Sequence, residues 1–497
     1  MPLPESSAAL RDLQPSSVWT IFGGMAAVPR PSKMEERIRA HLAEWLRKHE
    51  LKYREDARGN MVIDVPATAG SEGATLTVLQ AHVDMVCEKN SGVQHDFAHD
   101  PIRLVLDKDA QGEPIIRADG TTLGADNGIG VALALAAATD PDVVHGPLEI
   151  LLTTDEEAGM TGADALTPES FRSRRLLNLD SEEDDALYIG CAGGCDSNLT
   201  WEYATSAANE AEHVRVSVSG LRGGHSGGDI HEGRGNANKL LVRTLRAATG
   251  HGLRVVEIRG GSKRNAIPRE AHADVCGPKG LQGVLRQAAD RVVAQTRAES
   301  GEADARIAVE TTQPGAGAAS AVDTVRLLNA LAAIPSGVLG MHPKAAGLVE
   351  TSNNLSTIDC AVAGKRGLKV TAGTLTRSSS ESRLDEALQQ LVAIASLSGA
   401  EIVHANRYPG WDPDPDSPLV DLCRRVYQEV FKQEPKVAAI HAGLECGIIG
   451  QRVGKMEMIS FGPHITGAHS PDEQVWVNSV AKMWIYLKAV LAELART

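Results

Sequence analysis

The sequence lacks several features that would assign the chain to a membrane, to an oxidising compartment or to a nucleic acid. No run of residues approaches the roughly eighteen consecutive apolar positions of a membrane-spanning helix, and the first residues show no basic segment followed by an apolar one. The seven cysteines are odd in number and include no C-x-x-C pair, which fits reduced thiols. A formal net charge of −14 argues against the basic stripe typical of a nucleic-acid binder. We therefore expect a cytoplasmic protein without a membrane or nucleic-acid partner.

The composition is that of a large globular protein. Of the 497 residues, 42% are hydrophobic and 23% are charged, which is enough for two or three domains. Residues 1–192 alternate helical and strand-like patterns, which predicts an α/β fold with a mixed, mostly parallel sheet flanked by helices. Residues 193–403 change to alternating strands with glycine-rich turns, and residues 404–497 return to the first pattern. The simplest organisation is one α/β domain in two parts, 1–192 and 404–497, interrupted by an inserted αβ domain that could hold two subdomains.

One helix near the start of the chain can be predicted with its cap. Ser32 stands three residues before Glu35, the spacing of a capping box, in which the two side chains bond free amides at the start of a helix. Ile38, Leu42 and Trp45 follow at helical spacing. The pattern therefore predicts a surface helix with a Ser32–Glu35 cap and one buried apolar stripe.

Acidic residues and a histidine follow the apolar, strand-like runs of the first part. In an open α/β sheet the carboxyl ends of the strands form the crevice in which ligands bind, so these side chains could converge. His82 and Asp84 share one face of an extended chain, so Asp84 could bond one ring nitrogen of His82 while the other nitrogen binds a metal. Ordinary alternatives remain open: a core histidine, a helix N-cap at Asp126 and a turn acid at Asp180. The stretches are A-H-V-D at 81–84, G-A-D-N-G at 124–128, T-D-E-E at 154–157 and N-L-D-S at 178–181.

Three consecutive acids, Asp155 to Glu157, close the apolar run P-L-E-I-L-L. A solvated turn is the ordinary interpretation, because charges near a core are costly unless they are paired. Two histidines, with His469 far downstream, and two acids would offer zinc the nitrogen and oxygen ligands it accepts. Two ions bridged by a carboxylate would activate a water molecule. Adjacent glutamates could then supply one more ligand and one free carboxylate that takes the proton from this water.

Five motifs in this order resemble a known family. They are similar to the di-zinc metallopeptidase family that includes carboxypeptidase G, peptidase T and the bacterial aminoacylases, and most similar to its aminoacyl-histidine dipeptidase branch. The similarity extends over nearly the whole chain, with the inserted segment as the family's lid domain. The motifs are A-H-V-D-M-V, G-T-T-L-G-A-D-N-G-I-G, T-T-D-E-E-A-G-M-T-G, L-N-L-D-S-E-E and T-G-A-H-S-P-D-E, with L-R-G-G-H-S-G-G-D-I-H and R-N-A-I-P-R-E in the insertion.

The resemblance implies a metal ligand in each of the five motifs. Asp126 would bridge two zinc ions. His82 and Asp180 would hold one ion, and Glu157 and His469 would hold the other. Manganese or cobalt could replace zinc, because a site of histidines and carboxylates also accepts these metals.

The resemblance also implies roles for residues that do not bind the metals. Glu156 would act as the general base and then as the acid, and Asp84 would orient His82. In the lid, His225 would stabilise the oxyanion, often within a dimer, although a histidine in a glycine-rich turn can also be purely structural. Asn265 and Arg377 would bind the carboxyl end of the substrate, and the alternative for both is an exposed loop residue.

The expected activity is the metal-dependent hydrolysis of short, unblocked peptides, preferentially aminoacyl-histidine dipeptides. The alternatives within the family are an N-acyl amino-acid deacylase and a broader di- or tripeptidase. A non-catalytic binding protein with the same fold is the alternative from another class, and the presence of all the expected ligands and of the base argues against it. The resemblance further implies a homodimer and a lid that closes over the site. No role follows from the sequence for His231, Glu445 or His464.

Overall fold

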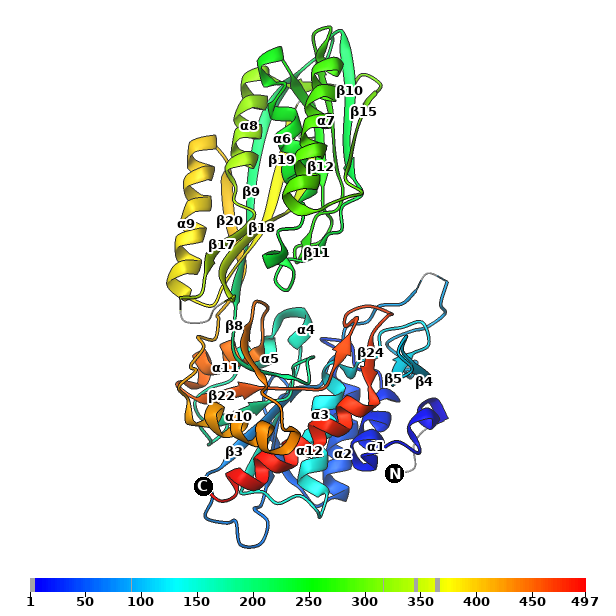
Figure 1. Cartoon of the computed structure of the whole chain (residues 1–497), viewed down its shortest axis with the longest axis vertical. Coiled ribbons are helices and arrows are strands. Elements are labelled where there is room, and N and C mark those ends of the chain that lie inside the picture. Colours follow the sequence, from blue (N-terminus) through cyan, green and yellow to red (C-terminus); the bar gives the residue numbers. More distant parts are fainter. Residues whose placement is uncertain (1–4, 91, 316, 344–346, 363–366) are drawn as a thin grey trace. The chain divides into compact units, whose positions relative to one another are not determined.

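The computed structural model describes residues 5–90, 92–315, 317–343, 347–362 and 367–497 (Figure 1). The chain divides into two compact units. The first unit comprises residues 1–191, 411–439 and 444–497, and the second comprises residues 192–410 and 440–443. The predicted insertion, 193–403, lies within the second unit. Each unit has a hydrophobic core of its own.

The first unit is built around a sheet of eight strands. Its four central strands, β6, β3, β7 and β22, run parallel, and β1, β2 and β8 pair antiparallel beside them. The predicted mixed α/β sheet is therefore confirmed, with its parallel part confined to the centre. Strands β3 and β6 are buried at every position, and most of their residues are apolar, as expected for parallel strands covered on both faces. In sheet order the bounds are β1 Lys52–Glu55, β2 Met61–Val65, β6 Leu148–Thr153, β3 Thr77–His82, β7 Arg175–Asn178, β22 Glu457–Ser460, β8 Ala186–Cys191 and β21 Lys436–Ile440.

Helices flank this sheet. Helix α3, the alanine-rich segment after Asp126, is almost entirely buried, and it packs on β3 and against α1. A sheet of four short strands lies beside the loop that carries His469. The helices are α1 Ser16–Ala26, α2 Glu36–Lys48, α3 Ala125–Thr139, α4 Glu156–Gly159, α5 Thr161–Asp164, α10 Pro418–Phe431, α11 Glu445–Val453 and α12 Val477–Leu494, and the short strands are β4 Leu104–Lys108, β5 Pro114–Ala118, β23 Ile465–Thr466 and β24 Gln474–Trp476.

The start of α2 differs from the predicted capping box. The helix begins at Glu36, and no side chain caps it. Glu35 instead accepts hydrogen bonds from the backbone N–H groups of Lys33 (2.7 Å) and Asp155 (3.1 Å). The Ser32 hydroxyl donates to Asp84 Oδ2 at 2.8 Å. The predicted cap was therefore wrong because both side chains bond distant segments, although the helix and its buried Ile38 and Leu42 are confirmed.

The second unit contains a ten-stranded sheet whose described pairings are all antiparallel. Two halves of this sheet each follow the chain order strand, helix, strand, strand, helix, strand, with sheet orders β15-β10-β14-β12 and β20-β9-β19-β18. The halves join where β12 pairs with β18. The first half lies in the sequence between β9 and α8 of the second, so one αβ subdomain is nested inside another.

The elements of the second unit have the following bounds. The strands are β9 Gly193–Ser206, β10 Glu212–Ser219, β11 Gly224–His225, β12 Arg254–Gly260, β13 Ala266–Ile267, β14 Ala271–Gly277, β15 Arg306–Thr311, β16 Ala318–Ala319, β17 Gly337–Met341, β18 Val349–Val362, β19 Gly367–Ser378 and β20 Glu401–Tyr408. The helices are α6 Ala237–Arg246, α7 Leu281–Ser300, α8 Ala321–Ala333 and α9 Glu381–Ser398. Among the described residues, none of the helices combines the length and the apolar composition of a membrane-spanning segment.

Candidate metal centre and active site

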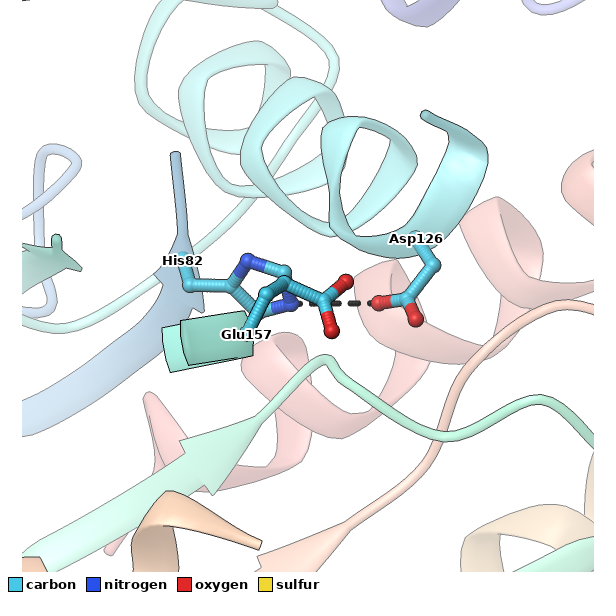
Figure 2. Close-up of side chains that lie close together, drawn as sticks. All are labelled: His82, Asp126 and Glu157. Carbon is cyan, nitrogen blue, oxygen red and sulfur yellow. Dashed lines mark hydrogen bonds and ion pairs between the residues drawn. The ribbon is translucent and has the colours of Figure 1, made fainter. Parts of the chain in front are cut away.

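The five predicted metal ligands all lie in the first unit, at the ends of its elements. His82 is the last residue of β3, and Asp180 follows β7. Asp126 stands in the first turn of α3, Glu157 in the short helix α4 after β6, and His469 in the loop between β23 and β24. Figure 2 shows the side chains of His82, Asp126 and Glu157 facing one another. One ligand atom from each of these three lies within 4.8 Å of the others.

Asp126 lies between the two imidazoles. Its Oδ1 is 3.1 Å from Nε2 of His82, and its Oδ2 is 3.3 Å from Nε2 of His469. His82 Nε2 is also 3.3 Å from Asp180 Oδ1, and His469 Nε2 is 2.9 Å from Glu157 Oε2. The structure thus brings the five residues together as two sets that share Asp126, which is the arrangement a bridging carboxylate requires.

Asp84 connects His82 to the acidic turn. Its Oδ1 lies 3.5 Å from His82 Nδ1, and its carboxylate accepts hydrogen bonds from the backbone N–H groups of Glu156 (3.1 Å) and Glu157 (3.2 Å). Burial alone would raise the pKa of Asp84, but the contacts with His82, Ser32 and the Glu156 amide outweigh it and lower the pKa. Asp84 is therefore an ionised, fully buried group that can hold the orientation of His82.

Of the two glutamates in the triplet, Glu156 is the one whose side chain is not among the clustered ligand atoms of the described residues. Burial, together with the negative charges of Glu157, Asp180 and Glu445, raises its pKa well above the ordinary value, against the opposing charge of His82. A carboxyl group with a raised pKa can both accept and return a proton near neutral pH. The expectation of a purely solvated turn does not fit these surroundings.

The charges of the cluster suit divalent cations. Burial and then the charge of Asp126 raise the pKa of Glu157 to about 7. Burial, with Asp126 also contributing, raises the pKa of Asp180 to about 6. Hydrogen bonds to Asp126 and Glu157 raise the pKa of His469 to about 11. Carboxylates this close to one another repel, and a cation bound between them would remove that repulsion. The nitrogen and oxygen donors present are those that zinc accepts.

Glu445, for which the sequence indicated no role, contacts the two strands that precede His82 and the acidic turn. It is completely buried at the start of α11, and its Oε2 accepts hydrogen bonds from Gln80 Nε2 (2.6 Å) and Thr153 Oγ1 (2.5 Å). Burial raises its pKa to about 8. Glu445 therefore joins the ends of β3 and β6, the strands that lead to His82 and to the acidic turn.

The predicted oxyanion residue, His225, lies beside Asn265 in the second unit. The strands β11 and β13 pair so that His225 faces Ala266, and the Ser226 N–H donates to the Asn265 carbonyl at 2.8 Å. His225 Nδ1 accepts a hydrogen bond from the Gly228 N–H at 3.0 Å. The proton of the neutral ring therefore sits on Nε2, which can donate to an oxygen. Asn265 itself is exposed in its turn.

Arg377 is not the exposed loop residue of the alternative interpretation. It lies in β19, is only 5% exposed, and donates from Nη1 to the Tyr408 hydroxyl at 2.7 Å. Its cross-strand partner in β18 is Ser352, whose hydroxyl is 2.8 Å from Nε2 of His441. His441 is buried, and burial and then the charge of Arg377 lower its pKa to about 3.

Two histidines for which the sequence indicated no role, His464 and His231, are not among the clustered ligands. His464 is half-buried against the Trp476 ring, at 4.1 Å between ring centroids. His231 is exposed in a short helical turn, residues Ile230–Glu232. Arg30 and Glu473, which the sequence did not single out, are both buried next to Asp126 and have no local pattern that reveals their distant partners.

Comparisons with known proteins agree with this geometry. The model of the peptidase family M20/M25/M40 matches residues 78–493. The cytosol non-specific dipeptidase of Escherichia coli (strain K12) is 41% identical over 98% of this chain and 99% of its own length. The crystal structure of aminoacylhistidine dipeptidase from Vibrio alginolyticus is 40% identical over 97% of this chain and 98% of its own, with a TM-score of 0.83. A Staphylococcus aureus tripeptidase shares the fold at 13% identity, covering 98% of this chain and all of its own, with a TM-score of 0.62. The chain therefore belongs to the peptidase family M20/M25/M40, which confirms the resemblance expected from the motifs.

Proposed function

We propose that the protein is a di-zinc dipeptidase that hydrolyses unblocked dipeptides, preferentially those with a carboxyl-terminal histidine. The observation that carries this proposal is the position of Asp126, which presents one oxygen to each of two imidazoles. Whole-length similarity to two dipeptidases, one of them an aminoacylhistidine dipeptidase, supports the substrate class. The name of the Escherichia coli relative, a non-specific dipeptidase, favours a broad dipeptidase as the second candidate.

The cluster in the first unit would hold the two metal ions. In this proposal His82 and Asp180 bind one ion, Glu157 and His469 bind the other, and Asp126 bridges them. Bound divalent ions would polarise the scissile carbonyl and lower the pKa of a water molecule. Manganese or cobalt would satisfy the same donors, so the metal available to the protein decides which is bound.

Glu156 would carry the proton during the reaction. Its pKa is raised by burial and by neighbouring carboxylates, so it can take a proton from the attacking water and return it to the leaving amine. Asp84 would keep His82 in position, because it contacts Nδ1 of the ring and the amides of Glu156 and Glu157 at the same time.

Three residues of the second unit are proposed to contact the substrate. The Nε2–H of His225 would stabilise the oxyanion. Arg377 and Asn265 would bind the substrate carboxylate, and the planar guanidinium suits a carboxylate because it can bond both oxygens. The proposed homodimer and the closing lid rest on the resemblance alone. The cytoplasmic location is supported by the name of the Escherichia coli relative, a cytosol dipeptidase.

The test is release of the carboxyl-terminal amino acid, histidine or leucine, by protein that has been stripped with a chelator and then supplied with zinc or manganese. The substrates are alanyl-histidine, β-alanyl-histidine, alanyl-leucine and N-acetyl-alanyl-histidine. We expect metal-restored cleavage of the first two and no cleavage of the acetylated peptide. Equal rates on alanyl-leucine would favour the broad dipeptidase, and cleavage of the acetylated peptide would favour a deacylase. No cleavage with any metal contradicts the proposal.

A further inference from the structure

The turn that carries Asp126 is held by two buried charged side chains of opposite sign. One is Arg30, which is 2% exposed. Its Nη1 donates to the carbonyls of Val83 and Asp84, both at 2.9 Å, and its Nη2 donates to the carbonyl of Gly124. Arg30 therefore ties the segment that follows His82 to the turn before Asp126.

Gly124 makes this contact possible. Its φ is +69°, a conformation that favours glycine. A Cβ atom there would overlap Nη2 of Arg30 and would lie 2.8 Å from the sulfur of Met85. Because Gly124 is also the N-cap residue of α3 and has no side chain, the free amides of this helix need a partner from elsewhere.

Glu473 is that partner. It is 2% exposed, and its carboxylate accepts hydrogen bonds from four consecutive backbone N–H groups. Oε2 accepts from Leu123 (2.7 Å) and Gly124 (2.9 Å), and Oε1 accepts from Ala125 (2.8 Å) and Asp126 (3.3 Å). Both oxygens act as acceptors of two bonds, so the ionised carboxylate is the form that fits. It also lies at the positive end of the dipole of α3.

Through its position in the sequence, Glu473 connects the loop of one proposed ligand to the turn of another. Glu473 stands four residues after His469, in the same loop between β23 and β24. Its carboxylate therefore ties the loop of His469 to the turn of Asp126, while Arg30 ties the same turn to the segment of His82. Arg30 and Glu473 therefore fix the distances between the three segments that carry His82, Asp126 and His469.

We propose that Glu473 and Arg30 are positioning residues of the metal centre, which fix His82, Asp126 and His469 at the separation that two ions require. This inference rests on the proposed metal binding. Arg30 and Glu473 act only through the backbone of the turn and its neighbours. The competing explanation is a purely structural role, in which losing the bonds lowers stability but leaves the metal affinity unchanged.

The decisive variant is Glu473→Gln. It keeps the size of the side chain, but the amide has one acceptor oxygen and sets an NH₂ group against two of the four backbone donors. We expect the weaker of the two zinc-binding steps to lose at least about tenfold in affinity, because small displacements of ligands and their supports cost about that much. The measurements are zinc stoichiometry by elemental analysis and zinc affinity by competition with a chromophoric chelator.

The second unit offers a matched control, Glu302→Gln. Glu302 is 1% exposed and accepts hydrogen bonds from the backbone N–H groups of Arg222 (3.1 Å) and Gly235 (3.0 Å). It caps a loop as Glu473 does, but none of the five proposed ligands lies in that loop. We expect Glu302→Gln to lower the melting temperature while zinc affinity and stoichiometry stay at the values of the unmodified protein.

The outcomes separate this inference from the proposed function. Two zinc ions on the unmodified protein and weakened binding by Glu473→Gln support both. Unchanged affinity in Glu473→Gln, with only a lower melting temperature, overturns the inference and leaves the proposed function intact. No zinc binding by the unmodified protein overturns the proposed function itself. If Glu473→Gln does not fold, as judged by circular dichroism, Glu473→Asp decides by the same measurements. It keeps the charge but retracts it by one methylene, so it should bind zinc more weakly than the unmodified protein, and an unchanged affinity overturns the inference.

Discussion

The two units surround their predicted site residues with opposite chemistry. In the first unit, the carboxyl groups of Asp126, Glu157 and Asp180 crowd around two imidazoles, and burial together with their mutual repulsion raises the pKa of two of them. In the second unit, burial and then the positive charge of Arg377 lower the pKa of the His441 ring to about 3. The comparison favours a cation between the carboxylates of the first unit, and it agrees with the proposed binding of a substrate carboxylate by Arg377 in the second.

The two groups are also built differently. Those of the first unit stand at element ends next to a parallel sheet, where residues far apart in sequence meet. Those of the second unit come from a short two-stranded sheet, which carries His225 next to Asn265, and from the antiparallel strand that carries Arg377. The rule that ligands bind at the carboxyl ends of parallel strands therefore locates the site residues of the first unit, but it does not apply to the antiparallel second unit.

The largest expected effect comes from replacing Glu156, the proposed general base among the acidic residues of the first unit. Glu156→Gln keeps the shape of the side chain but cannot accept a proton, so kcat should fall by roughly 10² to 10⁴, the usual contribution of a general base. The measurement is the steady-state rate on alanyl-histidine with zinc-loaded protein. Zinc stoichiometry should stay unchanged, because Glu156 is not one of the five proposed ligands.

Two results would contradict this role for Glu156. A kcat within about threefold of the unmodified protein means that another group moves the proton. A loss of bound zinc together with activity means that Glu156 is itself a metal ligand. The assignment of Glu156 as the base and Glu157 as the ligand would then be wrong.

The sequence was enough to locate much of the first unit and less of the second. Motif order and the apolar runs before His82 and Asp180 identified the sheet and the residues at its edge, because a buried parallel strand leaves a continuous signal. Ser32 was misinterpreted because a local spacing rule ignores a partner 52 residues away. Glu473 was missed for the same reason, since the amides it bonds lie about 350 residues earlier. Long-range polar contacts leave no periodic pattern in a sequence.

A smaller effect is expected from removing the Tyr408 hydroxyl, which contacts Arg377 in the second unit. The Tyr408 ring lies over Gly194, where a Cβ atom would come within 2.5 Å of the hydroxyl, and this hydroxyl accepts from Nη1 of Arg377 at 2.7 Å. If Arg377 binds the substrate carboxylate, Tyr408→Phe loses one hydrogen bond that holds the guanidinium. We expect KM for alanyl-histidine to rise roughly three- to tenfold, the effect of one such bond, with kcat nearly unchanged.

The controls for Tyr408→Phe use a second tyrosine and a second substrate. The Tyr203 hydroxyl, also in the second unit, is buried without a hydrogen-bond partner among the described residues, so Tyr203→Phe should leave KM unchanged. Alanyl-histidinamide has no carboxylate, and its KM should not respond to Tyr408→Phe. An equal rise in KM for the peptide and its amide would show that Tyr408 does not act through the carboxylate.

The smallest expected effect is a pH dependence of stability that arises from His441. Burial, and then the charge of Arg377, lower the pKa of this imidazole to about 3, whereas an unfolded chain holds it near 6.5. Between these values the unfolded state binds more protons than the folded state, so stability falls as the pH is lowered through this window. From pH 7.5 to pH 5.5 the loss from this residue is about 1.4 kcal/mol.

His441→Gln removes the titrating group and should therefore flatten this dependence. The measurement is the free energy of unfolding in urea at pH 7.5 and 5.5 for zinc-loaded protein, and the expected result is a loss about 1.4 kcal/mol smaller in the variant than in the unmodified protein. The pH dependence of zinc binding cancels in this difference, because His441 is not one of the proposed ligands. If both proteins lose the same stability, the ring titrates as an ordinary histidine, and neither burial nor the charge of Arg377 lowers its pKa.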